Sequence, residues 1–363
     1  MKIDKDIHIA STLDGTFYNS AEKLEESKSK LFERSWQLIG EEDLVKVPQA
    51  AYPFEFMEGF ITEPLLLTRD KEDKMHCMSN VCTHRGNILV TNPCILSGGI
   101  SCTYHGRRFG ADGCFKAMPE TEGMKDFPSE RDNLAKTPLK KWKQFLFTSL
   151  DPAIDFDEMI APMQERIGWM PVENFIFDPN RSREYLVKAN WALYCDNYLE
   201  GFHIPYIHKD LAKALDYDGY QSEIYKYSNL QLGVAKGGEM AFDLPKNSPD
   251  YGQRIAAYYY WLFPNIMFNF YPWGLSLNII RPLQHNLTKV IFRSFVWDYS
   301  KIDAGAGALL DRVEREDEAI VENVQKGISS RLYGKGRYSP KMEKGVHHFH
   351  TLISDFLQSA TTP

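Results

Sequence analysis

Two short motifs, C-T-H-R-G at residues 82–86 and C-T-Y-H-G at residues 102–106, limit what this chain can fold into more than any other feature. A structural zinc site usually draws on C-x-x-C and H-x-x-x-H pairs, whereas here each motif mixes one cysteine with one histidine. Such mixed pairs suit a 2Fe–2S cluster in which two cysteines hold one iron and two histidines hold the other. Bound zinc and a coincidence of core residues are the alternatives. The candidate ligands are Cys82, His84, Cys102 and His105.

The motifs lie in a β-rich part of the chain. Over residues 44–150, short β-prone runs are separated by clusters of Gly, Pro, Asn and Asp, which predicts a small all-β domain. Before it, Ser20 is placed to cap an amphipathic helix over residues 21–40. A chain of 363 residues is long enough for two cores. We expect three parts. Residues 1–40 form a helical segment that packs on the second domain, residues 41–155 form the β domain, and residues 156–363 form the second domain.

The second half mixes helices and strands. Helical spacing predicts helices around 159–170, over 190–208 and over 306–330. Between the last two helices, aromatic and β-branched runs are separated by turns short enough for antiparallel neighbours. These predicted strands cover residues 257–263, 265–271, 275–283 and 289–298. The fold class is therefore α+β.

A second candidate metal site lies in this half. His203 and His208 are separated by four residues and are preceded by Asp196 and Glu200. Two histidines and one carboxylate on one face of an iron ion leave positions free for dioxygen and substrate. The H-x4-H pair alone is a weak signal, since two histidines are as often structural. The carboxylate ligand has to come from elsewhere in the chain.

The two cysteine-histidine motifs resemble the Rieske domain of ring-hydroxylating and related oxygenases. Residues 190–208 resemble the catalytic domain of the same family; their sequence is N-W-A-L-Y-C-D-N-Y-L-E-G-F-H-I-P-Y-I-H. Respiratory Rieske proteins usually carry an extra cysteine beside each ligand pair, where this chain has Asn87 and Tyr104. Many oxygenases have Trp where this chain has Arg107, which indicates a subgroup.

The resemblance implies a catalytic domain of the helix-grip (START/Bet v1-like) type, with an antiparallel sheet and a long C-terminal helix. It implies that Asp317 is the third iron ligand beside His203 and His208. A solvated acidic helix face is the alternative for Asp317, because glutamates crowd around it. It also implies an acidic residue that links an iron histidine to His105 of a neighbouring subunit. By position this is Glu200, with Asp196 as runner-up, and Asp196 and Asn197 are expected to support the site.

Glu200 within D-N-Y-L-E-G-F-H resembles the branch that oxidises quaternary ammonium compounds such as choline, betaines or carnitine. We therefore expect the oxygenase component of a monooxygenase that hydroxylates or N-demethylates such a compound. An aromatic-ring hydroxylating dioxygenase is the alternative substrate class. The alternatives from other classes are a Rieske electron-transfer protein without oxygenase chemistry and a zinc-stapled binding module.

The expected partners follow from the resemblance and from motifs that are missing. The chain has no G-x-G-x-x-G motif before a helix and no four-cysteine ferredoxin pattern, so a separate NAD(P)H-dependent flavin or ferredoxin reductase is expected to supply electrons. The resemblance also implies a homotrimer. Aromatic residues are dense in the second domain and could hold a cation, although about half of the residues on a strand must pack the core.

Composition excludes several other classes. The formal charge is −7 and no Lys/Arg-rich run is present, which argues against nucleic acid as a partner. No apolar run is long enough for a membrane span and the first residues lack an apolar signal core, so we expect a cytoplasmic protein without membrane contact. The cysteines outside the motifs are expected to be buried free thiols. They are Cys77, Cys94, Cys114 and Cys195.

Overall fold

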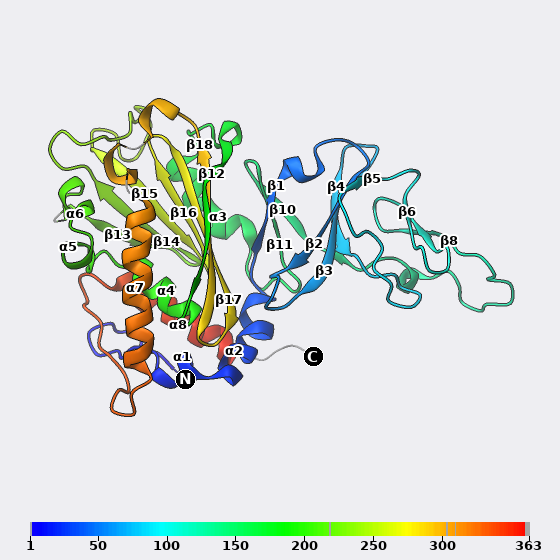
Figure 1. Ribbon diagram of the computed structural model, residues 1–363, viewed down its shortest axis with the longest axis horizontal. Coiled ribbons are helices and arrows are strands. Elements are labelled where there is room, and N and C mark those ends of the chain that lie inside the picture. The colour runs from blue at the N-terminus through cyan, green and yellow to red at the C-terminus, as the bar shows by residue number, and fades with distance from the viewer. Residues whose placement is uncertain (1, 218, 303, 309, 360–363) are drawn as a thin grey trace. The chain divides into compact units, whose positions relative to one another are not determined.

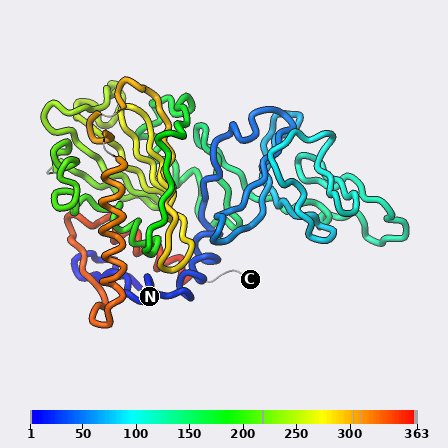
Figure 2. Tube along the Cα trace, viewed as in Figure 1, coloured from blue at the N-terminus to red at the C-terminus, as the bar shows by residue number. Residues whose placement is uncertain are grey.

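The computed structural model describes residues 2–217, 219–302, 304–308 and 310–359, and the chain divides into two compact units (Figures 1 and 2). One unit is Trp36–Ala153, and the other is formed by two separate stretches, Met1–Ser35 and Ile154–Pro363. The smaller unit begins and ends a few residues before the predicted positions, which were residues 41 and 155. No helix among the described residues is both long enough and apolar enough to cross a membrane.

The smaller unit is all-β. Its described strands form antiparallel sheets with the orders β1-β11-β10, β5-β2-β3-β4-β9 and β6-β7-β8. Leu66, Met78 and Phe109 pack in a core that also contains Cys82 and Cys102. The strands are β1 (Gln37–Glu41), β2 (Ala50–Phe56), β3 (Glu63–Arg69), β4 (Met75–Ser79), β5 (Cys94–Ile95), β6 (Ile100–Ser101), β7 (Arg108–Phe109), β8 (Phe115–Ala117), β9 (Lys136–Thr137), β10 (Leu139–Trp142) and β11 (Phe145–Thr148).

The larger unit is organised around one antiparallel sheet with the order β12-β18-β17-β16-β15-β14-β13. The middle strands are buried along almost their whole length, which explains their apolar and aromatic sequences. The strands are β12 (Ile176–Val187), β13 (Gln221–Ile224), β14 (Ser228–Val234), β15 (Ile255–Leu262), β16 (Ile266–Tyr271), β17 (Gly274–Gln284) and β18 (Leu287–Val296).

Helices pack on this sheet: α4 contacts β17, and α8 contacts β13. Figure 1 shows the long helix α7 across it, and α4 packs against α7, α8 and β17. The helices are α1 (Gly15–Asn19), α2 (Ala21–Ser27), α3 (Phe156–Ile167), α4 (Trp191–Tyr198), α5 (Ile204–Ile207), α6 (Leu211–Ala214), α7 (Leu310–Ile328) and α8 (Lys344–Gln358). Helix α8 and strands β12 to β14 were not predicted from the sequence.

The first predicted helix is too long. Ser20 does cap α2, because its side chain accepts from the N–H of Lys23 at 3.1 Å. The helix then passes through a π-helical turn, Lys28–Phe32, and residues 37–40 belong to strand β1, which pairs with β11. Tertiary strand pairing overrides the helical periodicity there.

The predicted helix over residues 190–208 is interrupted. Helix α4 ends at Tyr198, and α5 starts only at Ile204. Gly201 lies in the break, and a Cβ atom on it would stand 2.6 Å from a ring carbon of Tyr220. Close packing of Tyr220 therefore requires glycine at this turn. Among the other cysteines, Cys77 and Cys195 are buried as expected, but Cys94 is exposed and Cys114 is only partly buried.

Candidate metal centres and the tyrosine-lined cavity

The two cysteine-histidine motifs fold into equivalent turns of the smaller unit. In each turn the glycine N–H donates to the cysteine carbonyl oxygen at 3.0 Å, from Gly86 to Cys82 and from Gly106 to Cys102. Both glycines have a φ of 71°, a left-handed conformation that other residues rarely adopt. The final glycine of each motif therefore permits the tight turn that places a cysteine and a histidine on one loop.

The side chains of these turns converge. The ring centroids of His84 and His105 lie 4.7 Å apart, and the thiols of Cys82 and Cys102 lie within hydrogen-bonding range of each other. The Nδ1 atom of His84 is buried and has no hydrogen-bond partner among the described residues. A buried ring nitrogen without a partner fits a metal ligand, so the four side chains suit a histidine-ligated 2Fe–2S cluster.

The surroundings shift the pKa values of three of these four side chains, and burial raises that of Cys82. Burial favours the neutral thiol of Cys102, but the N–H groups of Tyr104 and His105 outweigh it and lower the pKa of this cysteine. Burial and the neighbouring His105 lower the pKa of His84, which keeps its imidazole neutral. A thiolate and a neutral imidazole are the forms that bind metals.

Arg107, which stands where many relatives have Trp, is buried. Its guanidinium bonds to Asp132 Oδ1 at 2.6 Å and lies 4.8 Å from the ring centroid of Phe115. The main-chain oxygen of Asp132 also accepts from Thr83, which lies between two candidate cluster ligands. With 3% of its side chain exposed, Arg107 supports the cluster loops and offers no surface to a partner protein.

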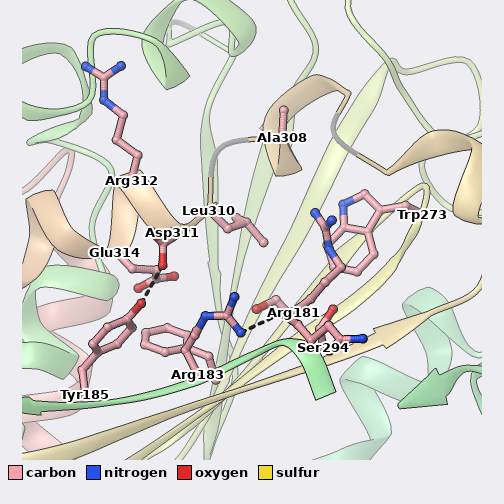
Figure 3. A pocket seen from close by; sticks show the side chains of 13 residues that line it. Arg181, Arg183, Tyr185, Trp273, Ser294, Ala308, Leu310, Asp311, Arg312 and Glu314 are labelled. Atoms are coloured by element: carbon pink, nitrogen blue, oxygen red, sulfur yellow. Dashed lines mark hydrogen bonds between the residues drawn. The ribbon is translucent and has the colours of Figure 1, made fainter. Parts of the chain in front are cut away.

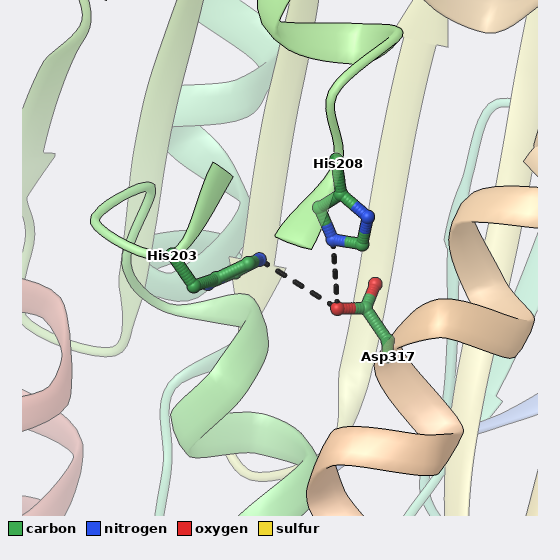
Figure 4. Close-up of side chains that lie close together, drawn as sticks. All are labelled: His203, His208 and Asp317. Carbon is green, nitrogen blue, oxygen red and sulfur yellow. Dashed lines mark hydrogen bonds and ion pairs between the residues drawn. The ribbon is translucent and has the colours of Figure 1, made fainter. Parts of the chain in front are cut away.

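The second candidate site brings together three side chains from distant parts of the larger unit (Figure 4). One possible ligand atom from each of His203, His208 and Asp317 lies within 4.8 Å of the other two. Asp317 Oδ1 is 2.9 Å from Nε2 of His208 and 3.6 Å from Nε2 of His203. Two imidazoles and one carboxylate in this arrangement match the donor set of non-haem iron oxygenases.

A carboxylate holds the far side of each histidine ring. Glu200 Oε1 is 2.7 Å from Nδ1 of His203, and Glu316 Oε2 is 2.9 Å from Nδ1 of His208. These bonds place the proton on Nδ1 and leave each Nε2 lone pair for a metal. Glu316 was not predicted, because the sequence shows it only as one of several glutamates around Asp317.

Asp317 does not lie on a solvated face of α7. Only 14% of its side chain is exposed, and Asn197 Nδ2 donates to its Oδ1 at 2.7 Å. Asn197 comes from α4, which packs against α7. The structure therefore places Asn197 behind the third candidate ligand, where it orients the carboxylate.

Asp196, the runner-up for the linking residue, takes part in a different network. Its Oδ2 accepts from the hydroxyl of Tyr18 at 2.9 Å, and its Oδ1 is 2.8 Å from Nε2 of His350. Tyr338 also bonds to His350, at 2.6 Å. No motif marks Tyr18, His350 or Tyr338, because they lie at opposite ends of the sequence and meet only in the fold.

A cavity of about 90 Å³ adjoins the three candidate iron ligands. Burial raises the pKa of its tyrosines well above the usual range, so their rings stay neutral. Burial and the charge of Asp317 also raise the pKa of Glu314 to about 8. Many of the other aromatic residues noted in the sequence, such as Phe268 and Phe270, are core residues. The tyrosines in the cavity wall are Tyr194, Tyr198, Tyr220, Tyr259 and Tyr271.

Known families match both units. Residues 35–128 match the Rieske 2Fe–2S domain, and residues 176–359 match the catalytic domain of the ring hydroxylating alpha subunit. A choline monooxygenase of Beta vulgaris is 31% identical over 96% of this chain and 78% of its own length. A carnitine monooxygenase oxygenase subunit of Escherichia coli (strain K12) is 26% identical over 95% of this chain and 93% of its own length.

Solved structures show the same fold. The crystal structure of the quaternary ammonium Rieske monooxygenase CntA in complex with an inhibitor has a TM-score of 0.76 and 21% identity, and the match covers 99% of both chains. The predicted α+β arrangement, with an N-terminal Rieske domain before a catalytic domain with an antiparallel sheet, is confirmed. From the family matches and the plant relative, the chain belongs to the ring-hydroxylating alpha-subunit family and is a Rieske-type oxygenase that uses a 2Fe–2S cluster and a mononuclear iron.

Proposed function

We propose that this chain is the oxygenase component of a monooxygenase that hydroxylates or N-demethylates a small quaternary ammonium compound. The observation that carries the proposal is the cavity lined by five tyrosines beside the His203, His208 and Asp317 cluster. Relatives named choline monooxygenase and carnitine monooxygenase oxygenase subunit, and the solved complex of CntA with L-carnitine, support this substrate class.

Each candidate ligand has a defined role in this proposal. Those of the smaller unit hold the 2Fe–2S cluster, and those of the larger unit hold the iron. When bound, the cluster supplies electrons and the iron activates dioxygen. Glu200 and Glu316 fix the tautomers of the two iron histidines, while Asn197 orients the ligand carboxylate of Asp317.

The tyrosines select the substrate. A quaternary ammonium group cannot donate a hydrogen bond, so it is recognised by the faces of electron-rich rings. Each ring that contacts the cation contributes on the order of 0.5 to 2 kcal/mol. The tyrosines of the cavity stay protonated, and the cavity is small enough to favour a compact N-methyl group.

Glu200 is also our candidate for the electron path between the two kinds of metal site. It bonds to His203, while His105 is exposed on the smaller unit. We propose that His105 of one subunit approaches Glu200 of its neighbour in a homotrimer, since inter-subunit electron transfer has been described for CntA. Sedimentation equilibrium of the active protein should give a trimer, and a fully active monomer would contradict this path.

Electrons come, in this proposal, from a separate NAD(P)H-dependent flavin or ferredoxin reductase, and the protein acts in the cytoplasm. The test combines the purified oxygenase with a surrogate reductase, NADH and dioxygen. Quaternary ammonium compounds should stimulate NADH consumption, with formaldehyde released if the reaction is N-demethylation. Hydroxylation of an aromatic ring, with no turnover of quaternary amines, would instead indicate a ring-hydroxylating enzyme. A reducible cluster without mononuclear iron or turnover would indicate an electron carrier.

A further inference from the structure

A second, larger cavity lies beside the tyrosine-lined one. It has a volume of about 420 Å³, is partly open to solvent, and is lined by residues of strands β12, β17 and β18 and of the start of α7 (Figure 3). None of the candidate iron ligands lines it. Its described walls include arginines from β12 and α7, together with the polar groups of Trp273 and Ser294.

The two cavities are neighbours. Leu310 and Glu314 of α7 line both of them. On β17, Ser276 lines the larger cavity and Asn278 the smaller one, and Ser276 Oγ donates to Asn278 Oδ1 at 3.2 Å. Residues two apart on a strand share a face of the sheet. A molecule bound near the iron ligands can therefore extend along this face, past Leu310, into the larger cavity.

The larger cavity has an unpaired positive charge. Arg183 donates to the main-chain oxygens of Asn180 and Ser182 and forms no ion pair with a carboxylate within the described ranges. The register of β12 is irregular between Asp178 and Arg183, which brings Arg181 to the same wall. Arg181 already interacts with other residues, so the charge available at this end of the cavity is that of Arg183.

The acidic residues of the cavity have hydrogen-bond partners of their own. Asp311 accepts from the hydroxyl of Tyr185 at 2.6 Å and pairs with Arg315 at 3.2 Å. Glu314 accepts from the hydroxyl of Tyr194 at 2.8 Å. The third arginine of the wall, Arg312, is already paired with Asp210 and Glu316. Arg183 is therefore an arginine of this wall whose guanidinium has no carboxylate hydrogen-bond partner among the described residues.

Two buried polar groups in the wall lack partners. The indole Nε1 of Trp273 and the hydroxyl of Ser294 are buried and make no hydrogen bond to any described residue. The two side chains are 1% and 6% exposed. A buried donor without an acceptor is unfavourable by about 1 to 3 kcal/mol, so such groups usually serve a ligand or an ordered water.

From these observations we propose that the larger cavity binds the carboxylate of a zwitterionic substrate whose quaternary ammonium group occupies the tyrosine-lined cavity. The inference rests on the proposed function and refines it: the substrate is a betaine-type compound with an anionic tail, and a simple amino alcohol fits less well. Arg183 and Ser294 act as specificity residues for the tail, because a carboxylate accepts from both a guanidinium and a hydroxyl.

A matched pair of substrates tests this directly. A trimethylammonio-butyrate and the trimethylammonio-butanol of the same chain length differ only in the carboxylate. With the holoenzyme and a surrogate reductase, the wild-type kcat/KM should be roughly ten- to hundredfold higher for the carboxylate, as expected for charge-assisted hydrogen bonds. Equal kcat/KM values for the two compounds would overturn the inference while leaving the proposed function intact.

Two variants locate the effect. Arg183→Gln should raise KM for the carboxylate compound roughly ten- to hundredfold. Ser294→Ala should raise it roughly threefold or more. Neither variant should change KM for the alcohol much. Lys289→Gln is the matched control, because Lys289 lies on the neighbouring strand β18 and pairs with Glu184. Iron content should be the same in all variants. A loss that is equal for both compounds would contradict a carboxylate site.

Failure of the proposed function and failure of the carboxylate site give different results. If no quaternary ammonium compound is turned over while an aromatic substrate is hydroxylated, both proposals fall. If both quaternary compounds are turned over and Arg183→Gln changes neither KM, only the carboxylate site falls. Direct calorimetric binding of the butyrate compound to wild-type and Arg183→Gln holoenzyme gives a second readout, in which the variant should bind roughly tenfold or more weakly.

Discussion

At the scale of single residues, Asp317 is the side chain on which the candidate iron site depends most. One of its oxygens lies close to both histidines and to the amide of Asn197. Replacing Asp317 with Ala removes one of three ligands, so the protein should lose its mononuclear iron and its oxygenase activity. Metal analysis should fall from about three irons per chain to about two, with the absorbance of the cluster retained.

The control for this variant is Glu322→Gln on the same helix, where Glu322 Oε1 accepts from the N–H of Lys188. It removes one acidic charge from α7 without touching the cluster of ligands, so iron content and turnover should stay near wild-type values. Full iron loading of Asp317→Ala would show that a different carboxylate completes the site.

Arg107 gives a second residue-scale prediction. Replacing it with Leu leaves Asp132 buried without its partner, and breaking such a buried pair costs about 3 to 5 kcal/mol. The unit that contains residues 36–153 should then lose its cluster more readily in urea, which can be followed by the visible absorbance. Arg108→Leu, at the exposed neighbouring position, should change the urea midpoint little. Equal effects of the two substitutions would mean that the ion pair does not support the cluster loops.

Single residues also show what the sequence could predict. The histidines and cysteines were found because close spacing along the chain is itself the signal. Glu316 and His350 escaped notice for physical reasons: the first is one of many acidic residues on α7, and the second contacts Asp196 and Tyr18 only through long-range packing. Such side chains carry no local pattern, because their partners lie more than a hundred residues away in the sequence.

At the scale of elements, α8 is tied to α4 and to the N-terminal segment by the network around His350. Replacing His350 with Leu leaves Asp196 without its histidine partner and removes bonds to Tyr338 and Tyr18. Loss of a connected buried network of this kind should lower the free energy of unfolding by about 2 to 4 kcal/mol. Thermal unfolding followed by circular dichroism measures this loss, and a change below about 0.5 kcal/mol would contradict the role of the network.

The stability of the folded protein should also depend on pH through a histidine of helix α8. Burial lowers the pKa of His348 from its ordinary 6.5 to about 4, and its Nδ1 is 2.9 Å from Oδ1 of Asn229. Between these two pH values the unfolded chain binds a proton that the folded chain does not, so stability falls as the pH is lowered through this window. The contribution amounts to at most about 1.4 kcal/mol per pH unit.

This pH dependence is tested by measuring the midpoint of urea unfolding at several pH values between 7 and 4. His348→Asn keeps a donor for Asn229 but cannot titrate, so its stability should depend less steeply on pH than that of the wild type. Parallel pH profiles for the two proteins would show that His348 does not contribute.

Among the elements, the strands with continuous aromatic and β-branched runs were predicted correctly, because a strand buried on both faces has a distinctive composition. The helix over residues 190–208 was predicted without its break. Periodicity detects which face is apolar, but it does not detect the break between α4 and α5, where the ring of Tyr220 packs against Gly201.

At the scale of the whole molecule, the larger unit is completed by residues from both ends of the chain. Tyr18 bonds to Asp196 and its carbonyl oxygen accepts from Asn190, and both partners belong to the segment that leads to the iron histidines. Deleting residues 1–20 should therefore lower iron occupancy of the larger unit while the cluster in residues 36–153 is retained. Separate assays of iron and acid-labile sulfide test this, and equal loss of both would indicate general unfolding.

The order of synthesis gives this arrangement a further consequence. The first 35 residues leave the ribosome long before α8, and the whole of the inserted unit is made in between. The insert can close its own contacts during translation, whereas Tyr18 in the N-terminal segment must wait for Asn190 and Asp196, and then for His350, before its hydrogen bonds are complete. Contacts between residues so far apart in sequence slow the folding of such a unit, and its iron site can form only after Asp317 has been synthesised.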